Sequence, residues 1–234
     1  MVGAQPVPAH EHALDAVVRV GDCSGVVIAP DRVLTAAHCV VHAPPTIVVA
    51  SVSVPVARCQ LHPRFEAGSS AYDIAECILA RPVSVRPIPA ATSSAGVGED
   101  VLLAGYGQRG AFDRMPATLR TVVTTAATAG PRALVVGTTD KTACMGDSGG
   151  PVLGRAGGGA ELRVLAILQG PTGALCRSPT EAVTVWPDGV DWTAGLAPPS
   201  SRSPSAVFTS AVVGAPLAIV IALLLRRRAA APAA

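Results

Sequence analysis

The sequence predicts an all-β fold, either a barrel or a sandwich. Short runs of β-branched and other apolar residues recur from residue 16 to residue 168, a composition typical of strands. Glycine and proline interrupt these runs at close spacing, as turns do between the strands of barrels and sandwiches. The chain has 234 residues, enough for one large all-β domain or two small ones.

The expected strands follow one another with short connections. Residues 29–32 carry the Pro-Asp chemistry of a turn after the second run, and Pro55 ends the third. In order, the apolar runs are 16–20, 25–28, 46–52, 74–79, 101–107, 119–123, 133–136, 151–153 and 162–168.

Charge argues against a nucleic-acid partner. The net charge is +2, but four of the 18 basic residues lie after residue 200, whereas all 16 acidic residues lie before it. The main body of the chain is therefore nearly neutral and carries no basic stripe of the kind that binds phosphates.

Ser148 lies in the segment CMGDSGGP at 144–151, where three glycines let the backbone bend and let other groups approach. A hydroxyl becomes a good nucleophile when a base removes its proton. His38, in LTAAHC at 34–39, is the candidate base, and Asp73 is the candidate carboxylate that orients it. The alternative for Asp73 is a surface residue at a strand edge. The other four histidines are expected to have no catalytic role: His10, His12, His42 and His62.

The two segments together resemble the trypsin/chymotrypsin-like serine peptidases, whose chain order His, Asp, Ser is the order found here. The resemblance covers residues 1–197. It implies two six-stranded antiparallel β-barrels and a short C-terminal helix, with the Pro- and Ser-rich stretch 81–99 crossing between the barrels. It also implies a serine endopeptidase that acts on polypeptides without a cofactor or metal, with the N–H groups of Gly146 and Ser148 as the oxyanion hole.

The cysteine count suits three disulfides formed in an oxidising compartment. The resemblance supplies two pairings, Cys23–Cys39 and Cys144–Cys176. The remaining Cys59 and Cys77 flank Asp73 on segments that pair as neighbouring strands in the family, so a cross-strand bridge is expected. The alternative is metal binding, although neither CxxC nor clustered His/Cys spacing favours it.

The amino terminus resembles that of a mature family member, an apolar pair followed by glycine and a small residue. In the family, a freed α-amine pairs with the Asp before the nucleophile, here Asp147, and orders the oxyanion hole. We therefore expect a signal and propeptide upstream of Met1. The alternative is an ordinary disordered amino terminus.

The resemblance also indicates a specificity pocket. Thr142 stands at its base, which argues against straightforward trypsin-like selection of Arg or Lys. Gly170 stands on one wall and Glu181 near the opposite wall. An exposed Glu181 is favoured; a carboxylate turned inward, which would select basic side chains, is the alternative.

Two residues depart from the family pattern. Leu168 replaces a serine that normally helps to polarise the catalytic Asp. Glu76 replaces an apolar residue, and we expect it to point outward beside the Cys59–Cys77 bridge, or the strand to be shifted in register.

The carboxy-terminal part differs in composition from the body. The peptidase domain is expected over 1–197 and a Pro/Ser-rich linker over 198–205. Residues 206–225 are uncharged and long enough to span a membrane, and the tail 226–234 begins with three arginines that favour the cytoplasmic side. The alternatives are a buried core helix and a sorting signal that is later removed.

The body is accordingly expected outside the cytoplasm, anchored to the membrane or released after processing. The alternative function, from another class, is a catalytically silent peptidase-like module that binds partners at the cell envelope.

Overall fold

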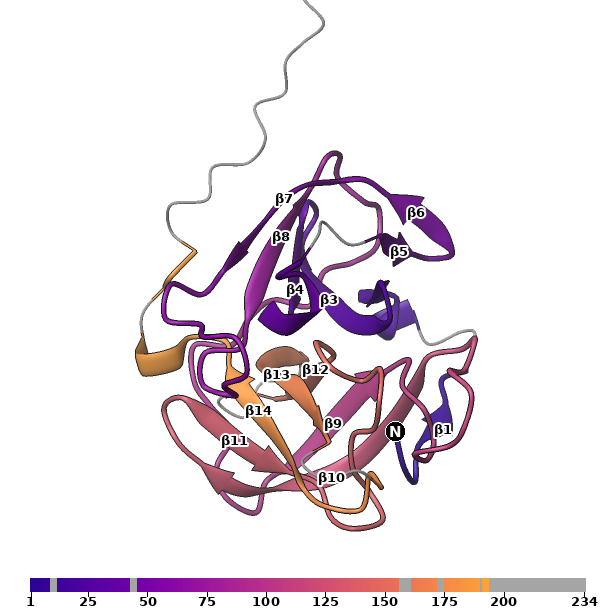
Figure 1. Cartoon of the computed structure of the whole chain (residues 1–234), viewed down its shortest axis with the longest axis vertical. Coiled ribbons are helices and arrows are strands. Elements are labelled where there is room, and N and C mark those ends of the chain that lie inside the picture. The colour runs from indigo at the N-terminus through magenta and orange to yellow at the C-terminus, as the bar shows by residue number, and fades with distance from the viewer. Residues whose placement is uncertain (9–11, 43–45, 156–160, 172–174, 190, 194–234) are drawn as a thin grey trace, which may run out of the picture. The chain divides into compact units, whose positions relative to one another are not determined.

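The computed structural model describes residues 1–8, 12–42, 46–155, 161–171, 175–189 and 191–193. Within these ranges the regular structure consists of β-strands and short 3₁₀ turns, so the all-β prediction is confirmed. The strands form two antiparallel sheets, with β2 to β8 in the first and β9 to β14 in the second (Figure 1).

The first sheet has seven strands in the order β6-β5-β2-β3-β4-β8-β7. Their bounds are β2 Val17–Val20, β3 Cys23–Ala29, β4 Arg32–Thr35, β5 Ile47–Val49, β6 Val52–Val54, β7 Val56–Leu61 and β8 Ala75–Leu79. The sheet is a half-barrel, because no pairing among the described residues joins β6 to β7. The prediction of a closed six-stranded barrel is therefore wrong for this half of the chain.

The extra strand arises from a hairpin inside the run 46–52, which was expected to be one strand. Ala50 and Ser51 have φ angles of 47° and 68°, and Val49 pairs directly with Val52. Two successive residues with positive φ make the two-residue turn that suits the twist of a hairpin. Since neither residue is glycine, asparagine or aspartate, the sequence carries no ordinary signal for this turn.

The second sheet closes on itself as a six-stranded barrel, as the resemblance implied. The ring runs β10-β11-β14-β13-β12-β9 and back to β10, and β1 adds to it by pairing with β10. The bounds are β1 Gln5–Pro6, β9 Asp100–Gly105, β10 Arg120–Ala129, β11 Ala133–Val136, β12 Pro151–Gly154, β13 Arg163–Pro171 and β14 Thr180–Thr184.

Two apolar cores hold the sheets. One contains residues of the closed barrel, such as Leu103 and Leu134, together with the buried side chain of Met1. The other joins the two sheets, because it contains Leu34 of β4 and also Ile167 of β13. Burial of each such side chain contributes roughly 1.5–3 kcal/mol, so the shared core keeps the two sheets in a fixed arrangement.

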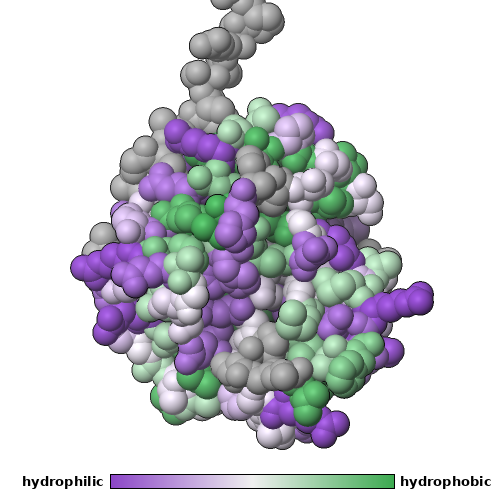
Figure 2. Space-filling model, in the orientation of Figure 1, coloured by the Kyte–Doolittle hydropathy of each residue, from purple (hydrophilic) through white to green (hydrophobic). Residues whose placement is uncertain are grey.

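The face drawn in Figure 2 mixes hydrophilic and hydrophobic residues, with the apolar ones in small separate groups. The large apolar side chains that are exposed in the described part of the chain are scattered along the sequence: Val52, Val97, Phe112, Val123, Met145 and Leu175. Scattered residues of this kind are normal on a soluble surface and identify no partner.

All three expected disulfides are present. The pairs are Cys23–Cys39, Cys59–Cys77 and Cys144–Cys176. Cys59 and Cys77 lie directly opposite each other on β7 and β8, so this bridge is the cross-strand bond expected from the sequence. The sulfur atoms of Cys23 and Cys39 lie near the His38 ring, but they are bonded to each other and offer no thiolate to a metal.

Glu76 does not point outward. Its side chain is fully buried and pairs with Arg32, with 3.1 Å between Nη1 and Oε1. β8 lies between β4 and β7, and all five of its residues are buried. Burial raises the pKa of the Glu76 carboxyl, the Arg32 charge opposes that rise, and the Asp191 charge adds to it. The expectation failed because successive residues of β8 are buried on both of its faces, which leaves no exposed side for Glu76.

The predictions for the carboxy-terminal part fall largely outside the described residues. The expected C-terminal helix, whose start we place at 188–192 from the resemblance, coincides with a 3₁₀ turn at Pro187–Gly189, and the described chain ends at residue 193. The predicted linker, membrane span and tail at 198–234 lie beyond it. In the described portion of the chain, no helix has both the length and the apolar character needed to cross a membrane.

Candidate active site

His38 and Asp73 form a close pair on the first sheet. His38 lies on the 3₁₀ turn Ala37–Cys39 that follows β4, and Asp73 lies just before β8, the neighbour of β4. The ring Nδ1 is 2.6 Å from Asp73 Oδ2, and the His38 backbone N–H donates to Oδ1 at 2.8 Å. The carboxylate, which is only 6% exposed, therefore favours the tautomer with the proton on Nδ1. The other ring nitrogen, Nε2, lies 3.5 Å from the Cys39 sulfur, which is bonded to Cys23 and has no proton to donate.

Ser148 belongs to the nucleophile loop, residues 144–150, which precedes β12 of the second sheet. Its hydroxyl donates to the carbonyl of Gln169 at 3.0 Å. No hydrogen bond joins Ser148 to His38 in the described structure. Ser148 nevertheless lies next to the cleft that His38 lines. Gly170 lines the same cleft, and a Cβ on Gly170 would lie 2.8 Å from Ser148 Oγ.

The nucleophile loop is tied to the first sheet through Ser24 of β3, which motif reasoning missed. The Ser24 N–H donates to the carbonyl of Ser148 at 2.8 Å, and the Ser24 hydroxyl donates to the carbonyl of Gly146 at 2.9 Å. Ser24 follows Cys23 in the sequence, but no pattern around it indicates contact with a loop more than 120 residues away.

Gly149 lies at the point where the nucleophile loop approaches the first sheet closely. Its φ is +80°, and a Cβ there would lie 2.2 Å from the Ser24 carbonyl and 2.9 Å from the Ala36 backbone nitrogen. Its N–H donates to the carbonyl of Leu168 at 2.7 Å, so the loop is held from both sheets at once. Only glycine combines this φ with this spacing.

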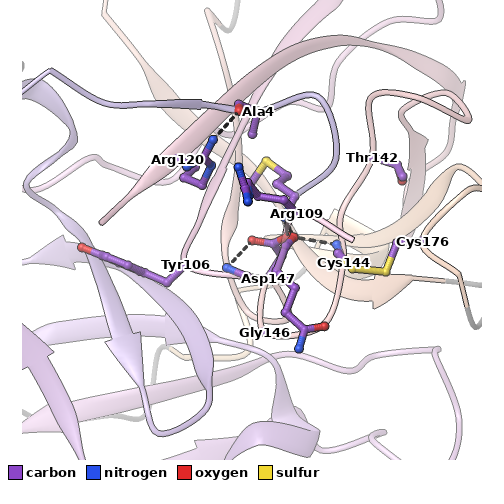
Figure 3. A network of polar contacts seen from close by, with 12 residues as sticks. Ala4, Tyr106, Arg109, Arg120, Thr142, Cys144, Gly146, Asp147 and Cys176 are labelled. Atoms are coloured by element: carbon purple, nitrogen blue, oxygen red, sulfur yellow. Dashed lines mark hydrogen bonds and ion pairs between the residues drawn. A yellow bond between two sulfur atoms is a disulfide. The ribbon is translucent and has the colours of Figure 1, made fainter. Parts of the chain in front are cut away.

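Asp147 is buried at the centre of a polar network (Figure 3). Its carboxylate accepts hydrogen bonds from the backbone N–H groups of Gly107 and Cys144, at 2.8 and 2.9 Å. The α-amine of Met1 lies 2.8 Å from the same carboxylate, and both groups are fully buried. Gly107 leaves room for this charge, since a Cβ there would lie 2.3 Å from the carboxyl carbon.

Burial acts on both partners of this ion pair. It raises the pKa of the Asp147 carboxyl, and the Met1 charge and the two N–H donors oppose that rise. It also lowers the pKa of the Met1 amine, against the attraction of Asp147. The pair therefore exists only in a pH range narrower than two exposed groups would allow.

Two of the predicted pocket residues, Gly170 and Glu181, line one cleft, whereas Thr142 is not among the residues that line it. Thr142 is buried, and its hydroxyl bonds to the carbonyl of Ser178 at 2.7 Å and to the Thr180 hydroxyl at 2.8 Å. Glu181 is half-buried on β14, opposite Gly170 in register. It lines the cleft that also contains His38, which has a volume of about 310 Å³. The carboxylate thus borders the candidate site.

A model of the trypsin family, described as Trypsin, matches residues 1–179. The chain belongs to the trypsin family. It is 28% identical over 160 residues to the protein named Trypsin iota of Drosophila melanogaster, and the match covers 56% of this chain and 64% of that protein. The chain thus spans somewhat less than two thirds of the length of this curated trypsin relative.

The packing of Gly149 in this trypsin-family chain gives a test. Gly149→Ala is expected to destabilise the protein by about 1–2 kcal/mol through its positive φ and by about 1–3 kcal/mol more through overpacking. Gly98→Ala is the matched control, because Gly98 has φ of +82° with no atom within 4 Å of a Cβ. Urea unfolding of both variants measures the difference; equal losses would contradict the close approach inferred at Gly149.

Proposed function

We propose that this trypsin-family chain is a serine endopeptidase in which His38, Asp73 and Ser148 act as the catalytic triad. The observation that carries the proposal is the His38–Asp73 pair, held by two hydrogen bonds of 2.6 and 2.8 Å beside the nucleophile loop. Ser148 lies next to Gly170, which lines the same cleft as His38. The substrate of such a domain is a polypeptide.

The reaction begins when the Ser148 hydroxyl leaves the Gln169 carbonyl and turns toward Nε2 of His38. Nε2 takes the proton as Oγ bonds to the peptide carbonyl carbon. The C–N bond then breaks, His38 gives the proton to the leaving amine, and an acyl-enzyme ester remains. Water, deprotonated by His38, hydrolyses this ester and restores Ser148. Long nucleophile–base distances are common without substrate, so the present rotamer is compatible with this role.

The N–H groups of Gly146 and Ser148 are proposed to hold the oxyanion. One such donor is typically worth roughly 3–4 kcal/mol in the transition state. Gly146 has φ of +86°, which suits glycine, and its carbonyl is fixed by Ser24. The Met1–Asp147 ion pair is proposed to order this loop, since Asp147 stands between the two donors in sequence and accepts from Cys144 at the start of the loop.

The alternative is a catalytically silent binding module. Two observations favour it: the Ser148 hydroxyl is engaged by Gln169, and Leu168 has no hydroxyl to offer Asp73. Asp73 instead receives its second hydrogen bond from the His38 backbone N–H, which keeps the carboxylate oriented without that serine. This substitute contact is why we prefer the enzyme.

A fluorophosphonate probe and a peptide substrate test the triad. The unmodified protein should label on Ser148, and Ser148→Ala should abolish labelling and lower turnover by about a millionfold. His38→Ala should also abolish labelling, whereas His42→Ala, which changes an exposed histidine, should retain it. Absence of labelling in the folded, unmodified protein would support the silent module instead.

The specificity pocket is proposed to involve Thr142, Gly170 and Glu181, with Glu181 favouring basic substrate side chains. Its carboxylate lines the cleft beside His38, and among the described residues it has no ion-pair partner. Thr142 is uncharged, and its hydroxyl is already engaged within the protein. The carboxylate is therefore the group left to pair with a cation.

Glu181→Gln should lower kcat/KM for Arg and Lys substrates by about tenfold to a hundredfold, because a hydrogen bond to a charged group is lost. Neutral substrates should change little. Glu161→Gln, which changes an exposed carboxylate on the surface, is the control and should alter neither class. Profiling with a peptide library measures both; equal losses for basic and neutral substrates would remove Glu181 from the pocket.

We propose further that the domain works outside the cytoplasm and that residues 206–225 anchor it to the membrane. Three disulfides suit an oxidising compartment, and the Arg226–Arg228 run would stay on the cytoplasmic side. Cells producing the full chain should retain it in the carbonate-washed membrane fraction, whereas a chain ending at residue 197 should be released. Recovery of both in the same soluble fraction would exclude the anchor.

A further inference from the structure

Asp73 follows a residue in an unusual conformation. Tyr72 has φ of +59°, in the left-handed region, where a residue with a bulky side chain is a genuine outlier. The N–H of Ile74 donates to the Tyr72 carbonyl at 2.8 Å, so the chain turns tightly around Asp73. Because φ at residue 72 sets the direction of residue 73, this conformation determines where the carboxylate points.

The conformation is held by contacts at the Tyr72 ring. The Tyr72 hydroxyl donates to Asp188 Oδ2 at 2.7 Å. Arg64 binds both groups, with Nη1 2.9 Å from the Tyr72 oxygen and 2.9 Å from Asp188 Oδ2. Arg132 approaches the other carboxylate oxygen, at 3.5 Å. The Asp188 carboxylate thus contacts three residues from separate parts of the chain, namely Arg64, Tyr72 and Arg132.

The opposite side of the ring is packed as well. His62 stacks on Tyr72 with 4.7 Å between ring centroids and meets Trp192 edge-on at 5.3 Å. The Trp192 ring N–H donates to the carbonyl of Val185 at 3.1 Å, which fixes this ring to the segment after β14. The half-buried Tyr72 therefore contacts His62 through its ring and Asp188 through its hydroxyl.

Asp188 also has a positive φ, +61°, in the turn Pro187–Gly189, a conformation that aspartate adopts more readily than most residues do. The Tyr72–Asp188 hydrogen bond joins the strained Tyr72 to a residue that lies 116 positions away. Strained backbone persists only when its surroundings over-determine it, and it concentrates at functional sites. Here the strained residue is directly bonded in sequence to the candidate catalytic carboxylate.

We propose that Tyr72 and Asp188 are positioning residues: their hydrogen bond holds residue 72 in the left-handed conformation and so aims Asp73 at His38. The inference rests on the proposed peptidase function. It also accounts for the absence of a hydroxyl at Leu168. The hydrogen bonds that Asp73 receives from described residues both come from His38, so the direction of its carboxylate depends on the backbone that carries it.

The experiment compares Asp188→Ala with the double variant Asp188→Ala/Tyr72→Asn. Asp188→Ala should lower kcat by about tenfold to a hundredfold with little change in KM, because Asp188 touches no substrate and a displacement of about 1 Å at a catalytic group can cost a hundredfold. Asparagine adopts the left-handed region readily without a clamp. The double variant should therefore recover most of the kcat that Asp188→Ala loses.

The kcat of the double variant distinguishes a positioning role of the Tyr72–Asp188 contact from a role in overall stability. Tyr72→Asn removes the stacking on His62, so a purely structural role predicts that the double variant is worse than Asp188→Ala. Glu161→Ala, which removes an exposed carboxylate paired with Arg86, is the control and should leave kcat unchanged. An unchanged kcat in Asp188→Ala, or a double variant no better than that single variant, overturns the proposal.

A second readout does not need turnover. The Nδ1–H proton of His38, hydrogen-bonded to Asp73, should give a low-field NMR signal in the unmodified protein. That signal should be lost or shifted in Asp188→Ala and return in the double variant. If no form of the protein cleaves peptides or labels with the probe but the signal follows this pattern, the peptidase function fails and the positioning contact stands. A signal unaffected by Asp188→Ala overturns the positioning contact whatever the activity.

Discussion

The close approach of Gly149 to the first sheet is the constraint on which the candidate site depends. The nucleophile loop comes from the second sheet, whereas His38 and Asp73 come from the first, so the proposed catalysis requires a fixed distance between the two sheets. The shared apolar core brings the sheets together, but apolar contact is not directional. Hydrogen bonds from Ser24 to the loop, and the absence of any side chain at Gly149, supply the direction.

The buried Asp147 carboxylate imposes a second condition. A charge in this position is costly unless it is paired and hydrogen-bonded, and here it has a buried amine and two backbone N–H donors. The network spans the amino terminus, the Gly105-Tyr106-Gly107 segment and the loop beside Ser148. Removing one partner would leave the others buried without it, so each member of the network depends on the rest.

The parts that could be predicted from the sequence are those encoded by local chemistry. The GDSGGP and TAAHC segments identified the family, the Cys59–Cys77 bridge followed from strand neighbours, and the second barrel closes as expected. The failures share a cause, because each depends on contacts distant in sequence. Ala50 and Ser51 turn without glycine, beside β2, and Glu76 is buried with its partner Arg32, which lies 44 positions earlier in the chain. The direction of the Ser148 hydroxyl is a rotamer choice that no residue pattern records.

The same reasoning explains how the site accommodates Leu168. A serine there would help orient Asp73 from within the barrel, through one hydroxyl that touches the carboxylate. In this chain the orientation comes from the backbone on either side of Asp73, held by Tyr72 and by the turn to Ile74. The polar cluster around Asp188 is exposed, and each of its ion pairs contributes little stability, since solvent and salt screen it. The cluster has a large effect only because it acts on one strained dihedral angle, φ of Tyr72, next to Asp73. At this position a small free energy decides whether the Asp73 carboxylate points toward His38.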